Sequence, residues 1–512
     1  MEPMAPTAST PPRRSLAGWA LLAVLVIIGS YVFTVLLAIA CVYLPLLMLR
    51  GPLFLSAIFL VVGGVSMAIT MLRSLAPRRD KAAPPGPRLE ADQEPRLFAE
   101  LEGIAKALNE PMPREVYLIA DVNAFVTERG GALGSRKRRV MGLGLPLLRI
   151  LTVSQFRAVL AHEFGHYYAG DTRLGPWVYK TRLTMFRTLV SLQSGSGAMR
   201  ALRINALAML ARNLVLSALQ WYWKLFMRAT LAVSRRLEFR ADELACWVAG
   251  APALIDGLCT IAKGAAGGPA FWQTELAPAL QAGYRPPVAE GFGRFMEARG
   301  IALAASALLE TELHKTKTNP YDTHPPLSVR VAAARATPYQ TSPENPASAI
   351  TLIDHLDALE LQLLEARLPQ LKKATLRPMP WDKVGVEIYI PGWRKYVTAY
   401  KALLADLAVD SLPEAAKNAK QLGARMRDPK GMLLTHEQRA GRASALLWMA
   451  FALALIDSGW ELHAQPGESY LIRDGLPPIN PSAIVAGLQS GKLAPDEWRK
   501  QCEAAGIVGL AL

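Results

Sequence analysis

The stretch TVSQFRAVLAHEFGHYYAG, residues 152–170, decides how this chain is read. It contains HEFGH at residues 162–166, which is an H-E-x-x-H pattern. Positions four apart share one face of a helix, so His162 and His166 can bind one zinc ion while Glu163 handles protons. The chain has only 7 histidines in 512 residues, so chance explains this pattern poorly. The alternative is a helix that carries two ordinary histidines.

The residues around HEFGH predict a buried helix. Thr152 and Gln155 fit a T-x-x-Q capping box at its start, and Gly170 stands where a helix would end. Phe156 and Phe164 are among the apolar residues that recur at helical spacing. Burying histidine and glutamate on such a helix costs free energy unless they have partners. A bound metal ion is the simplest partner.

A second stretch, SRRLEFRADELACWVAG at residues 234–250, offers the third ligand. Hydrolytic zinc usually has three protein ligands and keeps a fourth position for water. Glu238 and Asp242 are four apart on a predicted helix, so one carboxylate can bind metal while the other orients a ligand histidine. Arg235, Arg236 and Arg240 lie in the same stretch. The spacing alone therefore also allows a solvated charge cluster.

Four motifs together resemble a known family. They are DVNAFVTERGG at 121–131, HEFGH at 162–166, EFRAD at 238–242 and THPPLSVR at 323–330. In this order they resemble the M48 family of zinc metallopeptidases, the group of the HtpX and Ste24 proteases, over roughly residues 90–335. The resemblance implies a zincin-like fold of the gluzincin type, mainly α-helical with a small β-sheet at the active site.

The resemblance also implies site residues. It makes His162, His166 and Glu238 the ligands of one Zn²⁺ per chain. It makes Glu163 the general base, Asp242 the partner that orients a ligand histidine, and His324 the group that steadies the oxyanion. Asn123, Ala124 and Phe125 would lie along the cleft and bind substrate by backbone pairing. The basic run at 136–139 departs from the small or acidic residues that family members carry there, which affects the expected substrate preference but not the chemistry.

Two long apolar runs, residues 16–49 and 53–72, precede these motifs. Each reaches the roughly 20 residues that cross a bilayer core, so the sequence predicts an N-terminal transmembrane helical hairpin. Basic residues flank its two ends, whereas the turn holds only Arg50. The flanking residues are Arg13, Arg14, Arg73, Arg78, Arg79 and Lys81. The positive-inside rule then predicts a multi-pass protein of the bacterial inner membrane with its catalytic domain in the cytoplasm.

Charge and cysteine usage narrow the possible partners. The net charge of +15 suits a lipid bilayer with anionic headgroups, and no base-reading motif accompanies it, so nucleic acid is not an expected partner. The four cysteines form no C-x-x-C pair, which argues against a disulfide framework or a cysteine metal site. His314, His355, His436 and His463 have no comparable partners and are expected to be ordinary residues.

The remaining segments suggest a domain plan. We expect a membrane anchor at 1–75, a Pro-rich basic linker at 76–90, the peptidase at 91–340, a helical connector at 341–385 and a mainly helical domain of unknown role at 386–512. Segments 177–193 and 205–233 are apolar but charged, and we expect amphipathic helices at the membrane surface, with burial in the catalytic domain as the alternative. VGVEIYI at 384–390 suggests a short strand, and 443–456 suggests a core helix too short to span.

These observations predict a membrane-anchored zinc endopeptidase that hydrolyses membrane or misfolded proteins. Zinc-activated water would attack the peptide bond, with a glutamate as the base. One alternative is a catalytically silent membrane adaptor that keeps the same shell of residues. Another is a narrow-specificity processing protease. The expected partners are a protein or peptide substrate and the bilayer, and the oligomeric state is left open.

Overall fold

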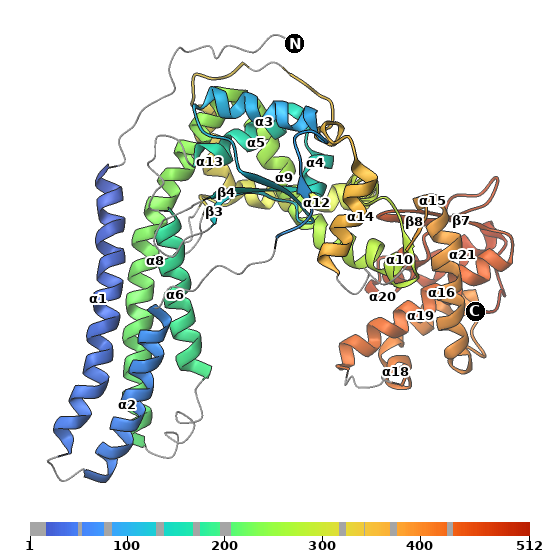
Figure 1. The fold of residues 1–512 in the computed structure, drawn as a ribbon. Helices are drawn as coiled ribbons and strands as arrows, with labels where there is room; N and C mark the ends of the chain where they lie inside the picture. The colour runs from blue at the N-terminus through green and yellow to red at the C-terminus, as the bar shows by residue number, and fades with distance from the viewer. Residues whose placement is uncertain are drawn as a thin grey trace. The chain divides into compact units, whose positions relative to one another are not determined.

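The computed structural model (Figure 1) describes the chain in ten stretches. These are residues 17–49, 54–75, 84–129, 138–166, 175–194, 206–316, 324–341, 344–368, 376–427 and 434–512. The chain divides into two compact units, unit 1 with residues 1–265 and 307–367 and unit 2 with 266–306 and 368–512. Helices dominate the described residues, and the sheets are small, so the predicted fold class is confirmed. The domain boundaries drawn from the sequence stay predictions.

Four helices of unit 1 pack lengthwise on one another: α1 (Ala17–Met48), α2 (Phe54–Leu75), α6 (Gly175–Ser194) and α8 (Ala206–Ala249). Leucines, alanines and methionines from all four fill the space between them. Gly64 of α2 lies against the backbone carbonyl of Cys41 in α1, which a β-carbon would displace. Leu21–Met48 and Ala57–Leu75 are long and apolar enough to cross a membrane. Their outward faces carry exposed leucine, isoleucine, valine and phenylalanine, as lipid contact requires.

Helices α6 and α8 do not lie where the sequence predicted. Segments 177–193 and 205–233 were expected to form amphipathic helices at the membrane surface. Both lie along the apolar hairpin rather than apart from it, because their polar groups find partners inside the bundle. Ser74 and Thr188 share a hydrogen bond of 2.5 Å, and Tyr222 donates to the Val26 carbonyl at 3.2 Å. Arg212 donates to the last carbonyls of α6, at Leu192 and Gln193. Helices bonded in this way cannot lie flat at the membrane surface if the hairpin crosses it.

A four-stranded sheet lies beside the helices of the peptidase region, in the order β1-β2-β4-β3. The strands are β1 (Arg88–Leu89), β2 (Glu115–Ile119), β3 (Ala124–Arg129) and β4 (Arg138–Gly144). β2 and β4 are parallel, whereas β1 and β3 are antiparallel to their neighbours. β3 is therefore an edge strand, as the cleft interpretation of residues 123–125 requires. The helices of this region are α3 (Pro95–Ala107), α4 (Leu145–Ile150), α5 (Val153–Gly165), α9 (Ala251–Phe271), α12 (Arg299–His314), α13 (Leu327–Arg335), the 3₁₀ turn η4 (Ala349–Leu352) and α14 (Leu356–Arg367).

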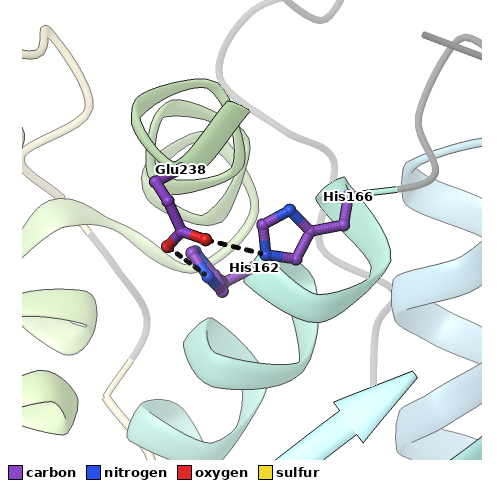
Figure 2. Close-up of side chains that lie close together, drawn as sticks. All are labelled: His162, His166 and Glu238. Carbon is purple, nitrogen blue, oxygen red and sulfur yellow. Dashed lines mark ion pairs between the residues drawn. The ribbon is translucent and has the colours of Figure 1, made fainter. Parts of the chain in front are cut away.

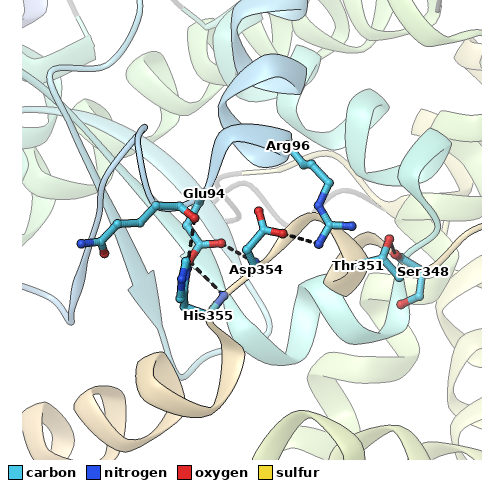
Figure 3. A network of polar contacts seen from close by, with 7 residues as sticks. Glu94, Arg96, Ser348, Thr351, Asp354 and His355 are labelled. Atoms are coloured by element: carbon cyan, nitrogen blue, oxygen red, sulfur yellow. Dashed lines mark hydrogen bonds and ion pairs between the residues drawn. The ribbon is translucent and has the colours of Figure 1, made fainter.

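A polar network ties the start of α3 to the chain before α14 (Figure 3). Glu94 is buried, and its carboxylate accepts hydrogen bonds from the backbone N–H groups of Asp354, at 2.5 Å, and His355, at 3.2 Å. The imidazole Nδ1 of His355 lies 3.3 Å from the same carboxylate. Arg96 donates to Asp354 at 2.5 Å. Glu94 thus caps the N-terminus of α14 from a distant part of the sequence.

Unit 2 is built around α19 (His436–Asp457). This helix is also long and apolar enough to span a membrane. Its apolar residues, including Leu446, Leu447 and Phe451, are instead buried in the core of the unit, as the sequence predicted for 443–456. The other elements that lie wholly within unit 2 are η3 (Trp272–Leu276), α10 (Ala277–Gln281), β5 (Tyr284–Arg285), α11 (Val288–Glu297), β6 (Arg377–Pro378), α15 (Trp381–Val384), η6 (Gly385–Tyr389), α16 (Ile390–Ala399), η7 (Lys401–Leu403), η8 (Val409–Ser411), α17 (Leu412–Lys417), α18 (Ala419–Ala424), β7 (Glu461–Gln465), β8 (Glu468–Ile472), α20 (Pro481–Ser490) and α21 (Pro495–Ala505).

The prediction of a short strand at 384–390 is wrong. Residues Gly385–Tyr389 form a π-helical turn inside one continuous helical run from Trp381 to Ala399. Trp381 and Val384 are buried, so helical packing overrides the β-branched composition of the segment.

Candidate metal centre

The HEFGH residues lie on α5, whose first turn forms as the sequence predicts. The Thr152 hydroxyl accepts from the Gln155 N–H, and the Gln155 side chain accepts from the Thr152 N–H. This capping box confirms the predicted start of the helix. The helix ends at Gly165, earlier than the stop expected at Gly170, which lies outside the described residues. His166 is its C-cap, so the second histidine sits at the end of the helix rather than inside it.

Glu238 comes from α8, which crosses α5 at this point. Gly165 makes the crossing close, because a β-carbon there would lie 3.1 Å from the backbone of Ala241. His162 Nε2 and His166 Nε2 each lie 3.6 Å from a carboxylate oxygen of Glu238 (Figure 2). One ligand atom from each of these three residues falls within 4.8 Å of the other two. The three side chains therefore face a common point.

Burial and hydrogen bonding fit this cluster to a metal cation. Glu238 Oε2 is buried and accepts no hydrogen bond of suitable geometry from the described residues. His324 Nδ1 lies 2.7 Å from this oxygen, which is ion-pair distance. Burial lowers the pKa of His166 to about 4, which leaves a neutral imidazole with a free lone pair. Two imidazoles and a carboxylate are a donor set that hydrolytic zinc sites use.

Asp242 orients His162. Its carboxylate accepts from His162 Nδ1 at 2.9 Å, which turns Nε2 toward Glu238. Arg330 of α13 donates to both oxygens of Asp242, at 2.6 and 2.9 Å. Burial opposes a charged Asp242, but the hydrogen bonds from Arg330 and His162 outweigh it and hold the pKa of this carboxyl well below its usual range. Asp242 therefore links His162 to Arg330, and its role in orienting a metal ligand stays a prediction.

The sequence interpretation missed Arg330. It is buried at 8% exposure and completes the chain of contacts from α13 through Asp242 to His162. Its only signal in the sequence is its place at the end of THPPLSVR, where it looks like one of 57 basic residues. A buried arginine needs a carboxylate partner, and that partner lies 88 residues away along the chain.

Glu163 lies beside the edge strand. Burial raises the pKa of its carboxyl, and a hydrogen bond from the backbone of Val126 partly offsets that rise. A carboxylate with a raised pKa holds a proton more readily near neutral pH, as a general base must. The contact with Val126 places Glu163 against the outer side of β3, next to the residues expected to bind substrate.

The structure also locates the three cleft residues. Asn123 is exposed just before β3, Ala124 is buried, and Phe125 is half-buried. The Phe125 ring lies over Gly142 of β4, its cross-strand partner, where any larger residue would displace it. In the basic run, Arg138 and Arg139 are paired with Glu115 and Glu110 at 2.7 Å, so these two charges are already balanced. The other two lie outside the described residues.

Comparison with known proteins places this region in a family. The model of peptidase family M48 matches residues 91–338. The protease HtpX homolog of Syntrophobacter fumaroxidans is 31% identical over 31% of this chain, and that of Acaryochloris marina is 32% identical over 35%. A homolog from Thermococcus sibiricus is 25% identical over 32% of the chain. The matches cover 54%, 61% and 55% of these relatives, so the chain spans little more than half their length. No solved structure matches the chain.

Proposed function

Because the chain belongs to peptidase family M48 over residues 91–338, we propose that it is a membrane-anchored zinc endopeptidase. One observation carries the proposal. His162, His166 and Glu238 converge from two helices, and a buried oxygen of Glu238 lacks a hydrogen bond among the described residues. A cation at the point of convergence would satisfy this buried carboxylate and both imidazoles at once.

The side chains around this point support a hydrolytic role. When bound, zinc supplies Lewis acidity that makes water a better nucleophile and polarises a carbonyl oxygen. Glu163 takes the proton from the attacking water and passes it to the leaving amine. His324, 60% exposed beside Glu238, donates to the oxygen that gains negative charge. Asp242 and Arg330 hold His162 in the orientation that this chemistry needs.

Substrate binding follows from the edge strand. β3 has a paired side, against β4, and an outer side that reaches Glu163. An extended peptide that pairs with the outer side would place its backbone beside the metal ligands, and the recognition would depend little on side chains. We propose Asn123, Ala124 and Phe125 as the residues that align it. Membrane or misfolded proteins are the substrates proposed.

The hairpin sets where this chemistry occurs. We propose that α1 and α2 span the bacterial inner membrane, with α6 and the first half of α8 packed beside them. In the sequence, basic residues flank both ends of the hairpin and only Arg50 lies in its turn, which supports a cytoplasmic catalytic domain. A cysteine introduced at Ala83 should then escape an impermeant reagent added to intact cells, and one at Gly51 should react. Labelling at Ala83 alone would place the peptidase on the opposite side.

The deciding experiment is Glu163→Gln, assayed in lipid nanodiscs on an unfolded protein substrate. We expect the purified variant to hold one zinc and the same fold but to lose at least about 10²–10⁴-fold in turnover, because general base catalysis contributes that much. Glu102→Gln, an exposed glutamate of α3, is the matched control and should behave as the unmodified chain. Zinc bound by the unmodified chain without any cleavage would favour the silent adaptor, and cleavage by the variant would remove Glu163 from its role.

A further inference from the structure

Helix α12 (Arg299–His314) leaves most of its surface exposed. Ala305 is its one fully buried residue. Leu303 and Leu308 are 64% and 54% exposed, and no large apolar side chain of the described residues is more exposed than Leu303. Even the lipid-facing leucines of α1 are less exposed. Two such leucines on one helix, outside the apolar hairpin, indicate a surface that contacts another molecule.

Side chains of α12 form two lines along the helix. Arg299, Leu303 and Glu310 are all exposed and follow one another at intervals of four and seven residues, so they form one line, which we call the charged line. Half-buried Ile301 and exposed Leu308, seven residues apart, form the second line, the apolar line. α12 is one continuous helix that runs from unit 2 into unit 1, so these spacings are fixed along its own axis.

Small residues fill the strip between the two lines. They are Gly300, Ala304, Ala307 and Thr311, and all four are exposed. A β-carbon on Gly300 would meet no atom within 4 Å. The distance between packed helices depends on the side chains at their contact, so this strip allows a second helix to approach closely. The charged and apolar lines would then close over the contact from its two sides.

The charged line is complementary to itself. Arg299 lies at its N-terminal end and Glu310 at its C-terminal end, with Leu303 between them. Among the described residues Arg299 has no ion-pair partner, and Glu310 has only His314, at 3.9 Å. Two copies of this line in antiparallel orientation would place each arginine opposite a glutamate, whereas parallel copies would place like charges together. The charges therefore select an antiparallel pair of the same helix.

One symmetric register satisfies both lines at once. A two-fold axis midway between Arg299 and Glu310 makes each of them face the other across the contact. Ile301 and Leu308 lie equally far from the same axis, so they also face each other. Each line meets its own copy across such an axis, and the two Leu303 side chains meet close to it. The register that pairs the charges therefore also covers the exposed leucines.

We propose that α12 pairs with α12 of a second copy of the chain, antiparallel and about a two-fold axis. A second copy is the occupant because one helix supplies both partners of each contact, the charged and the apolar. Lipid would cover the leucines but leave Arg299 and Glu310 unpaired. Two helices of 16 residues form a contact smaller than a standard interface, so we expect a dimer that depends on concentration. The proposal involves no zinc chemistry, so it and the proposed function can fail separately.

The first test exchanges the charges and measures the dimer Kd of the full chain in detergent by sedimentation. Arg299→Glu and Glu310→Arg should each raise Kd by about tenfold or more, because each places like charges opposite one another twice. The chain that carries both changes should regain the original Kd. Glu102→Arg on α3 and Arg499→Glu on α21, both at exposed positions, are the matched controls and should leave Kd unchanged. Loss of the dimer in the double variant as well would overturn the proposal.

The second test checks the register with single cysteines. Ala304 lies beside the proposed axis, so Ala304→Cys should form a disulfide-linked dimer under mild oxidation. Thr311 lies on the same strip but about 20 Å from its own copy in this register. Thr311→Cys should therefore stay at the background that the four native cysteines give. Equal cross-linking of both variants, or of neither, would overturn the register and with it the proposal.

The third test removes the apolar contact. Replacing Leu303 and Leu308 by serine should raise the dimer Kd by about tenfold or more, because each leucine is buried twice in the pair. Val386 and Val508, which are 58% and 53% exposed, are the matched control pair and should have no effect as serines. A dimer that survives the leucine changes would overturn the proposal, as would an unmodified chain that stays monomeric at every concentration.

A different occupant of α12 would also be recognised. With Glu163→Gln in every sample, binding of fluorescent casein can be measured without cleavage. If the serine changes at Leu303 and Leu308 weaken casein binding but leave self-association unchanged, the exposed side of α12 binds substrate and the dimer proposal fails. If they weaken self-association and leave casein binding unchanged, the proposal stands.

Discussion

The Glu94 network and the metal centre use the same kinds of residue in opposite ways. Each has a buried glutamate next to a histidine, an aspartate and an arginine. Both oxygens of Glu94 accept backbone N–H groups, so the carboxylate is fully used (Figure 3). Glu238 instead faces three imidazole nitrogens, those of His162 and His166 at 3.6 Å (Figure 2) and that of His324 at 2.7 Å.

This difference separates a structural contact from a reactive one. Native proteins satisfy nearly all buried polar groups, so a fully bonded cluster needs no further explanation. A buried carboxylate that faces several imidazoles is stabilised further when a cation binds between them. The partners of a buried carboxylate therefore say more about its function than the residue types around it.

The largest effect is expected at Glu238. Glu238→Ala removes a ligand and should weaken zinc binding by more than the roughly 10–100-fold that follows loss of an orienting partner. Competition with a fluorescent chelator would measure it, and circular dichroism would check the fold. Unchanged affinity would assign the third ligand to another carboxylate, with Glu243 as the next candidate.

His324 is the next test, because it contacts Glu238 but is proposed to act on substrate. His324→Phe should lower kcat by roughly 10²-fold with zinc and KM nearly unchanged, as for other oxyanion donors. Steady-state kinetics with metal analysis would measure all three. Loss of zinc would show that the 2.7 Å contact with Glu238 serves the metal site instead.

Asp242→Asn tests the orienting contact. The amide can still accept from His162 but loses the charge that pairs with Arg330, so zinc affinity should fall by about 10–100-fold. The same competition assay applies, and thermal unfolding gives the accompanying loss of stability. Unaltered zinc affinity with lower stability would mean that Asp242, like Glu94, serves the fold and not the metal site.

Glu94→Ala should give the smallest effect and the opposite pattern. It leaves buried N–H groups without an acceptor, which costs about 1–3 kcal/mol of unfolding free energy. Zinc affinity should not change, because the network lies apart from the metal ligands. Chemical denaturation would measure the loss of stability. Reduced zinc content in the folded variant would mean that the two clusters are coupled.

The sequence predicted the local parts of the site well. The capping box and the one-sided histidines depend on residues within one helix, and the structure has both. Glu238 required the family resemblance, since spacing alone did not separate it from Asp242. Arg330 could not be found, because its contact with His162 spans 168 residues and nothing local distinguishes it from other arginines.

The errors in the fold come from tertiary packing. VGVEIYI has the composition of a strand, but its first residue, Val384, and the preceding Trp381 are both buried within a helical run. The charged segments 177–193 and 205–233 suggested surface helices, because the sequence does not show that their hydroxyls and Arg212 find partners across the bundle. In both cases the deciding contacts join residues far apart in the chain.

The unbroken course of α8 constrains how this protein can change. A single helix carries Leu231, in the bundle core, and Glu238, at the metal centre. Each residue inserted or deleted between them would turn the carboxylate by about 100° around the helix axis. Only a change close to a whole turn would bring it back toward the histidines, shifted along the axis. The packing of Leu231 in the bundle thus fixes the direction in which Glu238 points at the metal centre. Natural variants should therefore keep the number of residues between them even where the residues differ.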